Sequence, residues 1–169
     1  KEVLIEQYSS PIMYLQAGND TIDEYNMEID EFFEIDEAKL IFDEKYRLFI
    51  RPEIDILKSN TDDVQIIEKR SSRANTRKNA RHMCEDIIYS VNQNDSLFTL
   101  DSFFEIGKDS KYRVQELEVI IKLPVGHRII IDDNLSDIVW NSNYIGGIWP
   151  GDLLGNEWVM TEDGLTEVK

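Results

Sequence analysis

The sequence predicts a mainly β protein with one α-helix at about residues 74–87. Three observations lead to this prediction. Apolar and charged residues alternate in several segments, most clearly over 114–125. The apolar spacing changes to a helical period once, after Ser71. Turn residues separate the segments, as in chains of many short strands. We therefore expect roughly ten or more strands and a single helix packed against them.

The first third of the chain reads as acidic strands rather than as a disordered tail. Apolar and acidic residues alternate there, which indicates a strand with a charged outer face. The apolar members are Met27, Ile29, Phe33 and Ile35, and the acidic members are Glu28, Asp30, Glu34 and Asp36. Further strands are expected over 38–42, 46–56 and 64–69. Pro52 interrupts the second of these and marks an edge, a bulge or a junction between strands.

The helix is predicted from one apolar stripe. Its members lie at i, i+3, i+4, i+7 and i+8, which places them on one helix face. They are Ala80, Met83, Cys84, Ile87 and Ile88. Ser71 or Ser72 is expected to cap the start of the helix. Strand patterns return afterwards over 88–91, 96–100, 103–106, 114–125 and 129–131.

The segment after Leu135 differs from the rest of the chain in composition and in the spacing of its apolar residues. Trp140, Trp149 and Trp158 lie nine residues apart, and short apolar pieces at 138–140, 148–149 and 158–160 are expected to form rungs or hairpins. We expect one β-rich domain over 1–169. It can also be divided into an acidic strand region, 1–63, and a region with the helix, 64–169.

Composition excludes some functions. The net charge is −16, so the chain as a whole repels nucleic acid and anionic lipid. Cys84 is the single cysteine, so no intrachain disulfide forms. No apolar run is long enough to span a bilayer. Because the chain begins at Lys1 within a strand pattern, it is expected to be a piece of a longer protein.

No catalytic site is expected. Carboxylate pairs such as Asp30 with Glu34, or Glu116 with Glu118, would be needed for glycoside hydrolysis, but same-face carboxylates on strands are usually solvated. A calcium site at 132–137 lacks the spacing of an EF-hand, so a polar turn is preferred. No zinc ligand set is visible, and Cys84 reads as a small buried apolar residue. We therefore expect no enzyme activity, no metal and no cofactor.

Charge is distributed unevenly along the chain. Six Lys and Arg residues cluster around the predicted helix: Lys69, Arg70, Arg73, Arg77, Lys78 and Arg81. Residues 19–44 hold eleven Asp and Glu against one Lys39. The cluster is a candidate docking patch for lipid headgroups or an acidic partner. The simpler interpretation, preferred at this level, is a solvated helix face neutralised by the chain's own acidic strands.

The three tryptophans give a second candidate site. Trp140, Trp149 and Trp158 would form an aromatic platform for carbohydrate or cell-wall material if they were exposed on one face. Packing in the core is the preferred alternative.

Four segments carry a family resemblance. They are KRSSRANTRKNARHMCEDIIY, SLFTLDSFF, KYRVQELEVIIKLPVGHRIIIDDN and WPGDLLGNEWVMTEDGL, within about Val64 to Leu165. The Arg-x-Gln strand that leads into Pro-x-Gly is the most specific part. Together they resemble the C-terminal toast-rack region of PspC-domain (phage-shock-protein-C-like) membrane proteins of Bacteroidetes-type bacteria.

The resemblance implies a stack of short sheets, akin to a β-helix or prism; a two-sheet β-sandwich is the alternative. It also implies a membrane portion upstream of this chain and a regulatory or scaffolding role in envelope stress. We therefore expect a soluble domain of a bacterial inner-membrane protein, with the periplasmic side preferred. It would be an interaction or sensing module whose partners are proteins of that system or a second copy.

Overall fold

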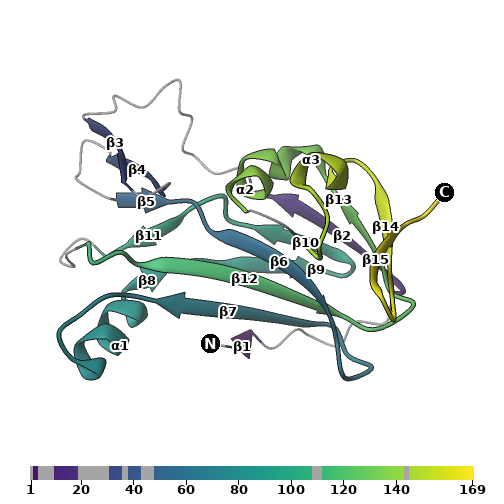
Figure 1. Ribbon diagram of the computed structural model, residues 1–169, viewed down its shortest axis with the longest axis horizontal. Helices are drawn as coiled ribbons and strands as arrows, with labels where there is room; N and C mark the ends of the chain where they lie inside the picture. The colour runs from purple at the N-terminus through teal and green to yellow at the C-terminus, as the bar shows by residue number, and fades with distance from the viewer. Residues whose placement is uncertain are drawn as a thin grey trace.

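The computed structural model describes residues 2–3, 10–18, 31–35, 38–42, 48–107, 112–142 and 145–169. Strands dominate these residues (Figure 1). The strands are β1 (Glu2–Val3), β2 (Ile12–Ala17), β3 (Glu31–Ile35), β4 (Ala38–Phe42), β5 (Leu48–Ile50), β6 (Glu53–Lys58), β7 (Gln65–Ser71), β8 (Ile87–Ile88), β9 (Val91–Asn94), β10 (Leu97–Leu100), β11 (Phe104–Ile106), β12 (Glu116–Leu123), β13 (Arg128–Ile131), β14 (Glu157–Thr161) and β15 (Gly164–Glu167). The helices are α1 (Arg77–Glu85), α2 (Ser136–Asn141) and α3 (Pro150–Leu153), with a 3-10 turn at Asp133–Leu135.

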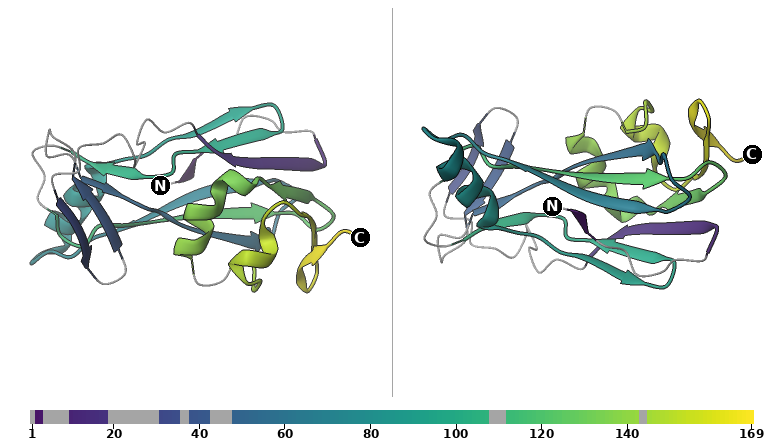
Figure 2. Two further views of the ribbon diagram at one scale, coloured as in Figure 1. Left: turned by 90° about the horizontal axis from the view of Figure 1, so that it is seen from above. Right: turned by 90° about the horizontal axis from the view of Figure 1, so that it is seen from below.

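The strands form three sheets. A four-stranded sheet has the order β1-β7-β12-β6, a six-stranded sheet the order β15-β14-β13-β2-β10-β9, and a five-stranded sheet the order β3-β4-β5-β11-β8. Figure 2 shows the four-stranded and six-stranded sheets as two layers that lie over one another. The expectation of a mainly β protein built from stacked short sheets is confirmed.

The core lies between the layers, and β12 shows why. Alternate residues of this strand, Leu117, Val119, Ile121 and Leu123, are buried, while the residues between them are partly or fully exposed. A period of two places every second side chain on the inner face. The strand predicted at 114–125 is therefore confirmed, although Val125 belongs to the turn before β13 and is exposed.

Pro52 marks a junction between sheets. β5, before it, belongs to the five-stranded sheet, and β6, after it, belongs to the four-stranded sheet. A proline lacks the N–H that a central strand needs, so the chain changes sheets where a ladder bond would be lost.

The prediction of a single helix and of a strand at 138–140 was wrong. Leu135, Ile138 and Val139 are buried at i, i+3 and i+4, and they fall on a 3-10 turn followed by α2. This segment covers the outer edge of β6, where the amide N–H of Ile54 donates to Ser142 Oγ at 2.8 Å. A helical connection thus closes a strand edge that would otherwise be free to pair.

In the acidic first third, β3 lies within the strand expected at 27–36, and β4 confirms the strand expected at 38–42. Residues 19–30, which include Met27 to Asp30, lie outside the described residues. No helix among the described residues is long and apolar enough to cross a membrane.

Candidate docking site at helix α1

Helix α1 starts later and ends earlier than the sequence predicts. Thr76, and not Ser71 or Ser72, is the N-cap, because its side chain accepts from the amide N–H of Asn79 at 3.2 Å. The helix ends at Glu85, and Ile87 and Ile88 of the predicted stripe belong to β8 instead. No α1 residue is buried. The helix therefore lies on the outside of the molecule.

Polar side chains from β7 and the residue after it hold α1 in place. The Arg70 guanidinium donates to the carbonyls of Cys84 and Ile87, at 3.3 and 2.8 Å. These lie at and just beyond the last turn of α1, where carbonyls lack intrahelical partners. Ser72 Oγ donates to the Ala80 carbonyl at 2.8 Å. Arg70 also forms an ion pair with Glu68, and its side chain is only 12% exposed. Arg70 is therefore a structural residue.

Lys69 is also engaged, although its side chain is exposed. Its Nζ donates to Glu118 Oε2 on the neighbouring strand β12 at 2.6 Å. This hydrogen bond and the charge of Glu118 raise the pKa of Lys69. Two of the six residues in the predicted patch therefore have partners within the four-stranded sheet.

The other four, Arg73, Arg77, Lys78 and Arg81, are exposed, and none forms an ion pair with a described residue. A fifth cation joins them from a distant part of the sequence. The backbone N–H of Arg73 donates to the carbonyl of Arg113 at 2.8 Å, and Arg113 is exposed. We call these five residues the α1 basic surface.

The charges of this surface oppose the helix that carries them. Arg77 and Lys78 occupy the first turn of α1, and no acidic residue lies in that turn. The N-terminus of a helix carries partial positive charge, so cations there are unfavourable. Asp or Glu at these positions would make the helix more stable. The two cations therefore reduce the stability of the helix to a small extent.

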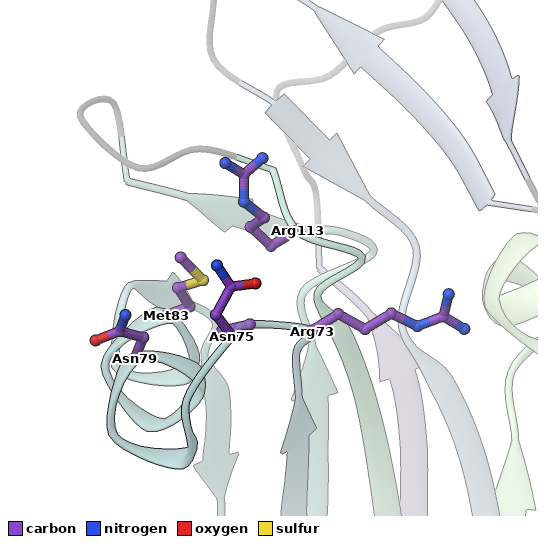
Figure 3. A pocket seen from close by; sticks show the side chains of 6 residues that line it. Arg73, Asn75, Asn79, Met83 and Arg113 are labelled. Carbon is purple, nitrogen blue, oxygen red and sulfur yellow. The ribbon is translucent and has the colours of Figure 1, made fainter.

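An open pocket of about 540 Å³ lies beside this surface. It is lined by Arg73, Ala74, Asn75, Asn79, Met83 and Arg113. Figure 3 shows the Asn75 amide between Met83 and Arg113, whereas the Arg73 side chain extends away from them. Such a lining offers amide and guanidinium donors next to an adaptable apolar side chain.

The backbone that presents Arg113 is strained. Val114 has φ +53°, which is an outlier for a β-branched residue. The Gln115 side chain is buried and accepts from the Arg113 amide at 2.5 Å, which fixes the turn. The sequence pattern assigned Arg-x-Gln to the strand rather than to a turn before it, and it did not identify Arg113 as part of the patch.

The structure separates the three tryptophans. Trp140 and Trp149 are 56% and 51% exposed, and their rings meet edge to face with centroids 6.0 Å apart. Trp158 is 7% exposed in β14, and its indole N–H donates to the Leu153 carbonyl at 3.1 Å. Two residues of the candidate platform therefore lie together on the surface, and the third belongs to the core.

The acidic candidates have structural partners. Glu116 accepts from Ser71 Oγ at 2.7 Å, and Asp137 forms an ion pair with Arg51 at 3.1 Å. Asp132 accepts from the Asn134 amide at 2.9 Å and so caps the 3-10 turn. Within the described part of the chain, no three His, Cys, Asp or Glu residues gather where they could hold a metal ion.

The fold defines a class of β-rich, stacked-sheet domains that present short helices on the outside. Comparison with known families identifies the family within this class: residues 41–166 match the toast-rack domain found in some PspC proteins. The chain belongs to this toast-rack family. No curated protein matches the chain, and no solved structure matches it.

Proposed function

We propose that this domain is a non-enzymatic interaction module of a PspC-type membrane protein in the bacterial envelope-stress (phage-shock) response. It docks through the α1 basic surface onto an acidic protein surface. Segments outside this chain attach the protein to the membrane.

One observation carries the proposal. The chain has a net charge of −16, yet Arg77, Lys78 and Arg81 of α1 and Arg73 just before it are exposed and form no ion pair with a described residue. Two of them also oppose the helix dipole. Exposure to solvent alone does not explain why cations occupy these positions. Complementary charge across an interface would, because it speeds association and selects the partner.

A protein partner fits better than an anionic bilayer. A bilayer presents negative charge over a wide plane, which would also repel the acidic remainder of this chain. A protein can place a few carboxylates against the basic surface alone. The pocket beside Arg113 adds amide groups and Met83, which suit side chains of a polypeptide.

The test is capture by crosslinking from the native envelope, with the full-length protein as bait. R73E/R77E/R81E should lose its crosslinked partner. The matched control, K58E/K122E/K169E, changes the net charge equally but away from α1, and it should retain the partner. Equal capture by both variants would remove the proposal. Vesicles of anionic lipid form a separate arm; binding to them that R73E/R77E/R81E abolishes would assign the surface to lipid instead.

A second function is favoured by the exposed pair Trp140 and Trp149, which could stack against carbohydrate of the cell wall. Binding of soluble cell-wall fragments should then be lost in W140A/W149A. The control is W140F/W149F, which retains aromatic faces at both positions. No binding by the unmodified chain would dismiss this function.

A further inference from the structure

We infer that the outer face of the six-stranded sheet is the surface through which two copies of this chain associate, face to face about a two-fold axis. Such association goes beyond the proposed function, because it uses a different surface. Helix α1 contacts β7 and β8, which belong to the other two sheets, so the α1 basic surface takes no part in it.

The six-stranded sheet has one face against the core and one face turned away from it. Figure 2 shows this sheet as one of two layers. Met13 and Leu15 of β2 are buried. The residues that alternate with them are partly or fully exposed: Ile12, Tyr14 and Gln16. Because successive side chains of a strand point to opposite faces, the exposed set lies on the outer face.

Apolar side chains lie next to one another at the centre of this outer face. Tyr14 of β2 is opposite Leu97 of β10 on one side and opposite Ile130 of β13 on the other. Leu97 and Ile130 are partly exposed, and Tyr14 is 42% exposed although it lies on a central strand. An exposed tyrosine between two aliphatic neighbours is typical of the centre of a protein interface.

The charge of the outer face is balanced. Within the six strands, the charged residues that face outward are Arg128 and Glu157, and they form an ion pair at 2.6 Å. The chain as a whole has a net charge of −16, so two copies repel each other over most of their surface. A second copy can approach this face without bringing like charges together, because Arg128 and Glu157 neutralise each other.

The outer face of the four-stranded sheet has the opposite character. Its strand β12 presents Glu116, Glu118 and Lys122 on that face, and Asp55 of β6 lies opposite Ile120. A charged face of this kind is what solvent exposure alone would favour in so acidic a chain. Interface centres are instead depleted of charged residues and enriched in aromatic residues, as the outer face of the six-stranded sheet is.

Two such faces can pack against each other as sheets do within a protein. Stacked sheets lie about 10 Å apart, and a two-fold axis brings the same patch of both copies together and closes at two copies. The sheet is about 24 Å wide across its six strands and about 20 Å long along β2. The pair would therefore bury about 1,000 Å², which is at the low end for specific interfaces. We expect a weak dimer that depends on concentration.

The experiment is sedimentation equilibrium of this chain over a range of concentration and salt. The average mass should rise towards twice that of one copy as the concentration increases from about 5 to about 500 µM. Added salt should strengthen association, because it screens the repulsion between two copies of charge −16 while the face itself is neutral. A mass of one copy throughout this range would overturn the inference.

A matched pair of variants tests the surface itself. Tyr14→Asp places a negative charge at the centre of the face on both copies and should raise the dissociation constant at least about tenfold. Leu57→Asp is the control, because Leu57 is 39% exposed but lies on β6 of the four-stranded sheet. It should leave the dissociation constant unchanged. A β-type circular dichroism spectrum shared by both variants shows that each is folded, and equal weakening by both would contradict association through this face.

The unmodified chain gives an independent measurement that needs no substitution. Amide NMR signals of β2, β10 and β13 should shift with concentration, whereas those of β7 and β12 should stay constant. Shifts confined to any other surface would overturn the inference. In the crosslinking test of the proposed function, Tyr14→Asp should still capture the partner of the α1 basic surface, so the two proposals can fail separately. Loss of a captured protein in Tyr14→Asp but not in Leu57→Asp, from a chain that never dimerises, would assign this face to that protein instead.

Discussion

The backbone N–H of Arg73 donates to the carbonyl of Arg113 at 2.8 Å and so joins the segment before α1 to the turn before β12. Two exposed arginines that lie far apart in the sequence are thus held next to each other through their backbones, while Figure 3 shows the Arg73 side chain extending away from Arg113. The strained turn at Val114 and the buried Gln115 fix this arrangement. If these residues bind a partner as proposed, a turn fixed in this way reduces the entropy lost on binding.

If α1 carries its cations for binding, then removing them should improve stability while impairing function. Arg77→Glu and Lys78→Glu each place a negative charge in the first turn of α1. Each should raise the free energy of unfolding by about 0.3–1 kcal/mol. Urea denaturation measures this, and Arg73→Glu, which lies outside the helix, should leave stability unchanged. A fall in stability for both helix variants would mean that these cations hold the fold together.

Substitution of Lys69 and of its neighbour Arg70 should change the free energy of unfolding by very different amounts. Arg70→Met removes the partner of the buried Glu68 and two bonds to carbonyls at the end of α1. Losing one member of a buried ion pair costs about 3–5 kcal/mol. Lys69→Met removes an exposed pair, so no measurable change is expected. Similar losses from the two substitutions, measured by chemical denaturation, would show that Arg70 is not structural.

Two adjacent glycines allow a matched test of the turn that covers β6. Gly146 and Gly147 both have positive φ, so alanine at either position costs about 1–2 kcal/mol. A Cβ on Gly146 would also lie 2.8 Å from Leu165 Cδ1 and 3.0 Å from the Ile56 carbonyl, whereas a Cβ on Gly147 meets nothing within 4 Å. Gly146→Ala should therefore lose a further amount of about 1–3 kcal/mol. Equal losses in thermal unfolding would contradict the contact between this turn and β6.

The stability of the domain should depend on pH through His127. Burial lowers the pKa of His127, so the folded chain binds its proton less readily than the unfolded chain does. Its contribution to stability is complete above the unfolded pKa of about 6.5, decreases as pH falls through that value, and becomes constant below the lower folded pKa. The free energy of unfolding should differ less between pH 7.5 and pH 5.5 in His127→Gln than in His82→Gln, which retains His127. If the free energy of unfolding changes equally with pH in the two variants, His127 is not the cause of the pH dependence.

The sequence was most informative where one period dominated. In β12 the alternation of Leu117, Val119 and Ile121 leaves one choice of buried face, and the structure agrees. In α1 the helical period continued by coincidence into Ile87 and Ile88, because two strand residues happened to fall on the same stripe. The short helix at 136–141 was missed since three apolar residues in a row suit a buried strand equally well.

The candidate site was only partly visible in the sequence. Arg113 depends on a hydrogen bond to Arg73 that no local pattern shows. The sequence did indicate a structural role for Arg70. Ile66, Glu68 and Arg70 lie on alternate positions of β7 and therefore share the inward face. That signal was hidden because the cations were counted as a cluster without regard to the direction of their side chains.

Docking through α1 is tested most directly by photocrosslinking in the full-length protein within its own envelope. A photoreactive amino acid replaces Lys78 of the α1 basic surface or, as a control, Lys58 at the far end of β6. We expect a discrete adduct from position 78, which disappears when the R73E/R77E/R81E substitutions are added, and no adduct from position 58. Equal adducts from both positions, or none from position 78, would contradict docking through α1.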